Sequence, residues 1–499
     1  MEILSTQWIL PSFWNPFLIG LALFLVLDVV KHRRRKQSYP PGPYPMPFVG
    51  NLFSLDFNNF PETLLKMRNK YGNVFSLQMF SENMIVLNGY DAVKEALVTK
   101  SEDTSDRPPT PIFDHHGFNN GVVFCNYNQH WKERRRFTLS TLRDFGMGKK
   151  SVEERVREEA GFLCSAFSAE KECAFDPLLL LNNAVSNVIC SVIFGERFDY
   201  SDKTFRKILT LLRETFELSN GVMPQLYKFF PWLMKIPGPH QKLFTQQRAY
   251  IECLNEIINR HRETWDANIK RDFIDAFFEE MEKNKNDSQS SFNDLSLMCT
   301  ISDLFIGGTE TTSNTLRWAL LMMLLHPHIQ CRVHEEIDKV IGSNRIPSVE
   351  DQLNMPYTNA VIHETQRYGN ILPMALFHMT CKDTKIQGYD IPKGTTIIPN
   401  LMSVLKDETV WEKPYQFYPE HFLNAQGNFM KRESFIPFSA GRRICLGEHL
   451  ARMELFVFFT SLLQRFEFRI PPKQPSPRDD PVFTFNFSPQ PFQLCAHER

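Results

Sequence analysis

The chain has 499 residues and a formal net charge of −1, with 42% hydrophobic and 23% charged residues. This composition excludes an intrinsically disordered chain, and the near-zero charge excludes bulk attraction to nucleic acid or to an anionic membrane. Length alone favours about three domains. The 10 cysteines form no C-x-x-C pair and no zinc-like array, so all but one are expected to be reduced thiols facing the cytosol.

The first 36 residues have the pattern of an uncleaved signal-anchor. An apolar run over 8–30 is followed at once by a basic run over 31–36, whereas a cleaved signal peptide carries its positive charges first. The positive-inside rule then places the rest of the chain in the cytosol. The run is short for a spanning helix and has Pro11 and Pro16 near its start, so a helix lying on the membrane surface is the alternative.

Residues 37–50 contain the sequence Pro-Pro-Gly-Pro-Tyr-Pro at 40–45. Prolines at this density make a stiff, extended connector. We therefore expect a hinge that holds the body of the protein, residues 51–499, at a fixed attitude to the membrane. A plain linker is the alternative.

Hydrophobic periodicity and turn residues predict the elements of the body. Segment 108–125 is rich in Pro, Gly, Asn and Phe and is expected to be a long irregular loop. The apolar, proline-broken segment 227–239 is expected either to pack in the core or to dip into the bilayer. We expect helices over 61–71, 91–98, 183–194, 295–325 and 448–466, strands over 74–77 and 84–87, a hairpin over 387–394 and a strand turn over 483–489.

Two adjacent glycines, Gly307 and Gly308, lie inside the predicted helix 295–325. Each costs roughly 1 kcal/mol relative to alanine in a helix interior, so a local bulge or a close ligand is favoured. A tight helix–helix crossing is the alternative.

The stretch 438–447 reads Phe-Ser-Ala-Gly-Arg-Arg-Ile-Cys-Leu-Gly and precedes a long amphipathic segment. Glycines let the backbone approach a flat cofactor, and N–H groups at the start of the next helix stabilise a thiolate. A haem iron held by Cys445 needs such a loop, and thiolate ligation favours O–O cleavage. For Cys445 alone, a small buried hydrophobe or a nucleophile with His449 as its base are the alternatives.

The five fixed positions of this stretch match the haem loop F-x-x-G-x-R-x-C-x-G, and the sequence therefore resembles the cytochrome P450 family. Three further motifs follow the family in the right order: W-x-x-x-R from Trp131, [AG]-G-x-[DE]-T-[TS] from Gly307, and E-x-x-R from Glu364. The resemblance covers essentially the whole chain. It implies the P450 fold, mostly α with a small β portion, as a single catalytic domain behind the N-terminal anchor, and it overrides the domain count from length.

The resemblance implies haem b as the cofactor, with the Cys445 thiolate as its axial ligand. The haem propionates want cationic and N–H donors. Phe377 precedes His378 where relatives more often have proline, which puts the local backbone in doubt. The expected propionate and haem contacts are Trp131, Arg135, Arg107, His378 and Arg443.

By the same resemblance Thr311 and Glu310 are catalytic residues. An alcohol can hydrogen-bond dioxygen or water, and a neighbouring acid can deliver the protons that oxygen activation needs. The residues expected to line the substrate pocket are Phe113, Phe118, Val122, Leu304, Gly308, Leu372, Phe485 and Phe487.

Glu364 and Arg367 are expected to be structural. They share one helix face, where a surface ion pair is the usual interpretation and is worth little. The family pairs them with an arginine from P-E-R-F, and this chain has His421 in that place. The substitution makes the third contact sensitive to pH.

The implied chemistry is monooxygenation driven by NADPH through cytochrome P450 reductase, with cytochrome b5 as a second candidate partner. Lys132, Arg134 and Arg442 are expected to give a basic face for the acidic reductase, although a merely solvated face is the alternative. The location implied is the endoplasmic reticulum membrane with the catalytic domain facing the cytosol. The substrate is expected to be small and lipophilic, and no nucleic acid partner is expected.

Segments 135–139, 182–187 and 230–232 carry a likeness to vertebrate microsomal family 2, subfamily J. That likeness implies epoxidation or hydroxylation of polyunsaturated fatty acids such as arachidonic acid, and also action on xenobiotics. Two rivals stay open: a reductase-independent P450 isomerase of lipid peroxides, whose members tend to lack the acid–alcohol pair, and a non-enzymatic haem sensor, which needs no proton-delivery helix.

Overall fold

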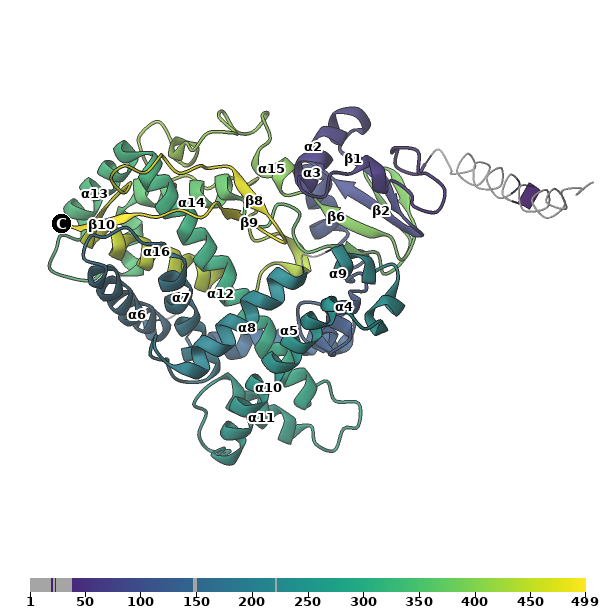
Figure 1. Cartoon of the computed structure of the whole chain (residues 1–499), viewed down its shortest axis with the longest axis horizontal. Helices are drawn as coiled ribbons and strands as arrows, with labels where there is room; N and C mark the ends of the chain where they lie inside the picture. The colour runs from purple at the N-terminus through teal and green to yellow at the C-terminus, as the bar shows by residue number, and fades with distance from the viewer. Residues whose placement is uncertain (1–18, 21–22, 24–37, 147–149, 220–221) are drawn as a thin grey trace, which may run out of the picture.

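The computed structural model describes residues 19–20, 23, 38–146, 150–219 and 222–499 (Figure 1). Nearly all of the predicted anchor, residues 1–36, lies outside the described residues. Within the described part, no helix is both long enough and apolar enough to cross a bilayer.

Helices form most of the described chain and surround one long central helix, α12, while a small mixed sheet occupies the end nearest the N-terminus (Figure 1). The helices are α2 (Phe60–Tyr71), α3 (Tyr90–Lys94), α4 (Pro111–Asp114), α5 (Gln129–Asp144), α6 (Lys150–Ala169), α7 (Leu178–Ile193), α8 (Lys203–Ser219), α9 (Val222–Tyr227), α10 (Lys242–Glu263), α11 (Phe273–Lys283), α12 (Asp294–Leu325), α13 (Pro327–Val340), α14 (Pro356–Gly369), α15 (Met402–Leu405) and α16 (Glu448–Arg465).

The largest sheet of the described chain has four strands in the order β1-β2-β6-β3. β2 pairs in parallel with β6, with Val86 opposite Ile398, and the other two pairs are antiparallel. Three two-stranded ladders complete the small β portion. The strands are β1 (Val74–Met79), β2 (Glu82–Leu87), β3 (His378–Met379), β4 (Thr384–Ile386), β5 (Tyr389–Ile391), β6 (Thr396–Pro399), β7 (Phe466–Arg469), β8 (Pro481–Phe483), β9 (Phe487–Pro489) and β10 (Cys495–Glu498).

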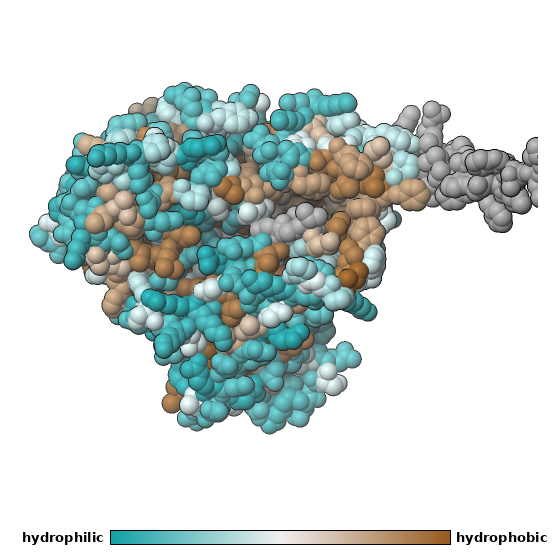
Figure 2. Space-filling view, in the orientation of Figure 1, coloured by the Kyte–Doolittle hydropathy of each residue, from teal (hydrophilic) through white to brown (hydrophobic). Residues whose placement is uncertain are grey.

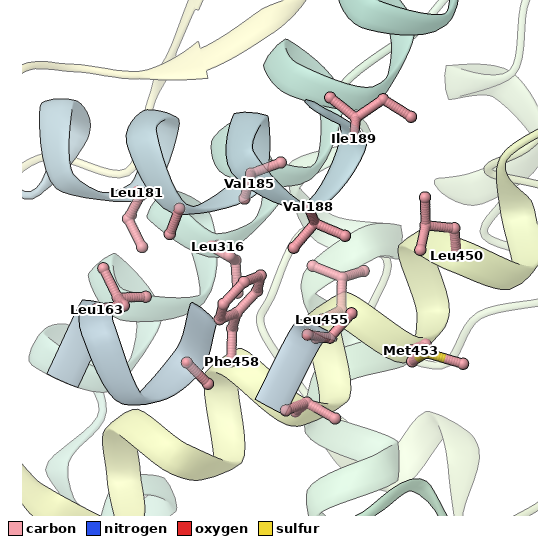
Figure 3. Packing of buried hydrophobic residues seen from close by; sticks show 14 of the residues in the cluster. Leu163, Leu181, Val185, Val188, Ile189, Leu316, Leu450, Met453, Leu455 and Phe458 are labelled. Atoms are coloured by element: carbon pink, nitrogen blue, oxygen red, sulfur yellow. The ribbon is translucent and has the colours of Figure 1, made fainter. Parts of the chain in front are cut away.

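The main core lies where α6, α7, α12 and α16 meet (Figure 3). Val185 and Val188 of α7, Leu316 of α12 and Phe458 of α16 point toward one another there. α12 and α16 are buried along most of their length, and their apolar residues lie on all sides of the helix. The prediction that the segment after the cysteine loop is amphipathic is therefore wrong. This core fixes the helix that carries Glu310 and Thr311 against the helix that follows the cysteine loop.

Most elements predicted from periodicity are confirmed within one to four residues, including the hairpin of β4 and β5 and the turn between β8 and β9. The expectation of an irregular loop over 108–125 is wrong in part. Pro111 begins the short helix α4, and Phe118–Asn120 forms a 3-10 turn. Proline is favoured at a first helical position because it has no N–H to leave unbonded. The helix predicted over 183–194 begins earlier, at Leu178, whose N–H is capped by Asp176 Oδ1 at 2.9 Å.

The described part of the predicted hinge, from residue 38, lies against β1. Ser76 donates its hydroxyl to Pro40 O at 2.9 Å and its N–H to Pro41 O at 2.7 Å. A Cβ at Gly42 would lie 2.1 Å from Ser76 O, so only glycine allows this approach.

Candidate active site

The cysteine loop, residues 438–447, leads directly into α16. Cys445 N donates to Phe438 O at 3.1 Å, which closes the loop on itself. Gly441 has φ +78°, and a Cβ there would lie 1.7 Å from Leu97 O. Glycine is therefore required at this position both for the backbone conformation and for the close approach.

Two opposing effects act on the Cys445 thiol. Burial and the charge of Glu448 raise its pKa, the N–H groups of Gly447 and Glu448 and the charge of Arg135 act to lower it, and the net shift is upward. Arg135 is held close because Nη2 donates to Ile444 O at 2.6 Å. His449 is exposed on the first turn of α16, and no hydrogen bond joins it to Cys445 among the described residues. The protein surroundings alone therefore keep the pKa of Cys445 above its usual value, and no histidine base adjoins it in the described chain; a bound iron would stabilise the thiolate.

Accessible surface occurs at two places in the interior. Cys445 is surrounded by protein atoms, as the effect of burial on its pKa shows, yet its side chain is accessible. Along α12, residues 297–305 and 312–324 are buried, whereas Gly307 is exposed and its neighbours 306, 308, 310 and 311 are partly accessible. Both places therefore face interior space, which is what a cofactor and a substrate between them require.

Three arginines gather beside the cysteine loop. Arg107 and Arg443 are each 7% exposed, and no ion pair joins either of them or Arg135 to a carboxylate in the described chain. Burial lowers the pKa of Arg107 well below its usual value, and the charges of Arg443 and Arg135 lower it further. Burial also lowers the pKa of Arg443 to about 10.

Some N–H donors beside the cysteine loop bond backbone carbonyls of the protein. Arg443 donates to Ser105 O at 2.9 Å, to Val122 O at 3.2 Å and to Cys125 O. The indole N–H of Trp131 likewise donates to Val122 O, at 2.9 Å. These two predicted haem contacts therefore brace the loop before α5, with the Arg443 guanidinium 4.2 Å from the centre of the Trp131 ring.

Arg107 and Arg135 keep donors that bond no described residue. Arg107 Nη1 donates to Leu376 O at 2.9 Å and to Phe377 O at 2.7 Å, which leaves Nη2 free. The doubt about the backbone at Phe377 is thus answered, because its carbonyl holds Arg107. His378 lies beside them with Nδ1 2.8 Å from Thr104 O, and burial keeps its pKa well below the usual value.

This donor set fits a haem. Two buried guanidinium groups and a third that is half-buried, without carboxylate partners among the described residues, are costly in isolation and are neutralised by a buried dianion. The two propionates of a haem supply that charge next to the cysteine that would ligate its iron.

The middle of α12, around Gly307 and Gly308, differs from one expectation. α12 continues through the two glycines without a bulge, and Thr311 Oγ1 donates to Gly307 O at 2.7 Å. A Cβ at Gly308 would lie 3.0 Å from Ile189 Cγ1 of α7, whereas a Cβ at Gly307 would meet nothing within 4 Å. The tight helix–helix crossing therefore explains Gly308, which is partly accessible, and its assignment to the substrate pocket stays a prediction. Gly307 is the glycine that faces open space.

The carboxyl of Glu310 is subject to several charges. Burial raises its pKa; Arg317 and Arg213 act to lower it, and Glu217 acts to raise it. An acid with a raised pKa beside an alcohol is suited to proton delivery.

Aromatic side chains dominate the loop that was expected to cover the haem. Phe113 stacks on Phe124 at 4.5 Å and meets Phe118 edge-on at 6.3 Å between ring centres. At the other predicted wall, Phe487 O accepts hydrogen bonds from α12, and Phe485 at the turn is 48% exposed. Of the other predicted lining residues, Leu372 is partly accessible, while Leu304 and Val122 are buried.

Comparison with known proteins decides the family. A family model described as Cytochrome P450 matches residues 40–496. The chain belongs to the cytochrome P450 family. Its cofactor is haem b with a cysteine thiolate ligand, and Cys445 is the cysteine of the family loop; the electrons come from NADPH through a reductase. The chain is thus a P450 monooxygenase.

Similar proteins extend over almost the whole chain. Cytochrome P450 2D3 of Rattus norvegicus is 53% identical over 490 residues, covering 97% of this chain and 98% of that protein. Cytochrome P450 2D20 of Mesocricetus auratus is 54% identical over 484 residues, covering 96% and 97%, and Cytochrome P450 2D6 of Homo sapiens is 51% identical over 490 residues, covering 97% and 99%. The likeness to subfamily J is not supported, since these relatives carry 2D names.

The E-x-x-R pair of this P450 is fully buried. Arg367 donates to both carboxylate oxygens of Glu364 at 2.7 Å, and both residues are 0% exposed. His421 takes the third position with Nδ1 3.2 Å from Glu364 Oε2. Because His421 Nε2 accepts the Lys413 N–H at 3.1 Å, the ring proton lies on Nδ1, and neutral His421 can donate to Glu364. The three predicted structural residues are thus brought together.

Two features of the P450 site were missed from sequence. Asp303 accepts the N–H groups of Val122 at 2.7 Å and Val123 at 2.9 Å, so it anchors the loop before α5 to α12; burial raises its pKa to about 7. Glu454 of α16 is 1% exposed and bonds Thr312 of α12, and burial keeps its pKa well above the usual value. The sequence signal that could have found both residues is a carboxylate within an otherwise apolar helical segment.

One predicted surface residue is wrong. Arg134 is 4% exposed, and its guanidinium lies 3.1 Å from Cys125 Sγ and 3.3 Å from Ser291 O. It cannot contribute to a basic docking face, because the face of α5 that carries it turns inward. Lys132 and Arg442 are exposed, although Arg442 is paired with Glu102.

Proposed function

We propose that this P450 inserts one oxygen atom from dioxygen into small lipophilic molecules, at the endoplasmic reticulum membrane with its catalytic domain facing the cytosol. The observation that carries the proposal is the pair of accessible surfaces, at Cys445 and at the centre of α12, with arginines beside the cysteine that have no carboxylate partner among the described residues. Cytochrome P450 reductase supplies the electrons, and cytochrome b5 is a second candidate donor that we expect at the same exposed basic side chains.

The bound haem supplies dioxygen activation and transfer of the oxygen atom to a C–H or C=C bond. Cys445 would hold the iron, and the N–H groups of Gly447 and Glu448 would stabilise the negative charge of its thiolate. Arg107, Arg135 and His378 hold the propionates. Trp131 and Arg443 act one step further out, because their donors fix the backbone around that cluster.

Glu310 and Thr311 serve the proton steps. Thr311 exchanges its hydrogen bond to Gly307 O for one to dioxygen or water, which costs little because the i−4 carbonyl keeps its helical partner. Glu310 lies next to it on the accessible segment and holds a proton for transfer.

For the substrate we propose long apolar molecules, with polyunsaturated fatty acids such as arachidonic acid and lipophilic xenobiotics as the two classes to compare. The clustered rings of Phe113, Phe118 and Phe124 suit an apolar chain or ring. Apolar side chains also gather at the end that carries β1, β2 and α9, beside the start of the described chain, where a substrate dissolved in the membrane would arrive (Figure 2).

The test uses the full chain with haem in phospholipid vesicles, cytochrome P450 reductase and NADPH. We expect oxygenated products from arachidonic acid or from a neutral aromatic xenobiotic, and none without NADPH. Thr311→Ala should keep the haem and divert electrons to peroxide, whereas Thr315→Ala, one turn along in the buried part of α12, should stay coupled.

Three results contradict the proposal. Product from a lipid hydroperoxide without NADPH would favour the isomerase, and no product from any substrate would favour a haem sensor. Equal coupling in Thr311→Ala and the native chain would remove Thr311 from the proton steps.

A further inference from the structure

Arg317 is a buried cation on α12 without a partner. Its side chain is 6% exposed, and its Nε has no hydrogen-bond partner among the described residues. No ion pair joins it to a carboxylate in that part of the chain; its nearest aromatic contact is Phe492, 5.9 Å from the guanidinium carbon. Burying an unpaired charge costs free energy, so a buried arginine without an ion-pair partner suggests a functional role.

Arg317 follows Glu310 by seven residues on the same helix. Two turns of an α-helix return to the same face about 10.5 Å further along. Because helical side chains lean toward the N-terminus, the long arginine side chain reaches back toward Glu310. The charges that act on Glu310 are Arg317 on α12 and Arg213 and Glu217 on α8. Those that act on Arg317 are Asp176 first and then Glu310.

Two buried side-chain oxygens, one on α12 and one on α7, also have no hydrogen-bond partner among the described residues. Asn314, between Glu310 and Arg317 on α12, donates Nδ2 to Phe487 O at 2.8 Å, but its buried Oδ1 has no partner. On α7, Ser186 donates to Thr309 Oγ1 at 3.2 Å, and the buried Oδ1 of Asn183, one turn earlier on the same face, also has no partner.

Buried donors and acceptors that find no protein partner are usually satisfied by ordered water, which needs two to four polar contacts. Arg317 Nε is a donor, and the two asparagine oxygens are acceptors. α12 and the adjacent α7 thus each carry buried polar atoms that ordered water would satisfy, and those of Asn314 and Arg317 share a helix face with Glu310.

We propose that Arg317 is a positioning residue for Glu310: its charge keeps the buried carboxyl able to ionise, and with Asn314 and Asn183 it anchors the waters that bring protons to it. A proton passes from solvent along these waters to the Glu310 carboxylate, and from the carboxylic acid to the Thr311 side. This inference rests on the proposed role of Glu310 in proton delivery.

The test compares Arg317→Met with Arg317→Lys and Arg213→Met in the full-length, haem-loaded chain. Arg213 is the matched control, because it also acts on Glu310 but its side chain is 57% exposed and is 3.9 Å from Glu217. Solvent screens such a charge. Methionine at 317 removes the charge and fills the space, and replacing an unpaired buried charge by an apolar side chain does not by itself unfold a protein.

The first measurement is the infrared carbonyl band of the protonated Glu310 carboxyl, assigned by its loss in Glu310→Gln and titrated with pH without substrate. Removing a charge at this range in a protein interior changes the acid dissociation constant about tenfold. We expect Arg317→Met to raise the midpoint pH by about one unit, which is a tenfold change in the dissociation constant. Arg317→Lys should return the midpoint most of the way to the native value, and Arg213→Met should leave it close to that value.

The second measurement is product formed per NADPH consumed, as a function of pH. We expect Arg317→Met to shift this profile in the same direction as the infrared midpoint, with peroxide taking the lost electrons. Native values of both in Arg317→Met, or an equal shift in Arg213→Met, would overturn the inference. Unchanged coupling in Glu310→Gln would instead overturn the proposed role of Glu310 itself.

Discussion

Replacing Gly308 of α12 with alanine puts a methyl group against Ile189 of α7. The added Cβ would lie 3.0 Å from Ile189 Cγ1, 3.2 Å from its Cβ and 3.3 Å from its Cδ1. Overpacking of this kind costs about 1–3 kcal/mol, whereas the higher helix propensity of alanine returns about 1 kcal/mol. The same change at Gly307 meets no atom within 4 Å and keeps the whole propensity gain. The two variants should therefore differ by about 1–3 kcal/mol, with Gly308→Ala the less stable.

The assay is thermal unfolding of the haem-loaded protein without substrate. For a chain of this size, 1 kcal/mol shifts the midpoint by no more than about 2 °C, so a gap of a few degrees is expected between the variants. In an Ile189→Ala background the crowding is removed, and Gly308→Ala should then stabilise the protein as Gly307→Ala does. Equal midpoints for Gly307→Ala and Gly308→Ala in the native background would refute the tight crossing of α7 and α12.

Three other predictions concern the loop, the core and pH. Gly441→Ala should lose haem because its Cβ would lie 1.7 Å from Leu97 O. Gly427 has a similar φ of +80° and open space around it, so Gly427→Ala should keep haem and lose only about 1–2 kcal/mol of stability. Full haem content in Gly441→Ala would contradict this prediction. Glu364→Gln should lower the free energy of unfolding by about 3–5 kcal/mol, since it leaves Arg367 buried without its charge partner; an unchanged urea midpoint would argue against the pair. The raised pKa of Asp303 means that the native state binds the Asp303 proton more tightly than the unfolded state does, so the free energy of unfolding should fall as pH rises from about 4 to 7. In urea titrations, Asp303→Asn should flatten this dependence of stability on pH. An unaltered dependence would count against the raised pKa.

The local parts of the site could be predicted from sequence because their chemistry is local. The glycines around Cys445, the spacing of Trp131 and Arg135, and the acid–alcohol pair depend on residues a few positions apart. The structure adds why one of them is obligatory, since Gly441 passes within contact distance of Leu97 O from a distant helix. The element boundaries could be predicted for the same reason.

What could not be predicted depends on which element covers which face. Periodicity shows that Arg134 and Trp131 share a helix, but not that Arg134 turns toward Cys125 and Ser291. It shows two glycines in α12, but not that Ile189, more than 100 residues earlier, packs against only one of them. The expectation of subfamily J was not supported for another reason. It rested on three short segments, whereas the subfamily is decided by identity over the whole chain.

The most direct test of the central claim is the carbon monoxide difference spectrum of the dithionite-reduced full-length protein. We predict the strongly red-shifted Soret band of a thiolate–haem–CO complex, its loss in Cys445→Ala, and its retention in Cys173→Ser, which changes an exposed cysteine on another part of the surface. A band typical of histidine-ligated haem in folded protein, or an unchanged thiolate band in Cys445→Ala, would contradict the assignment of Cys445 as the haem ligand.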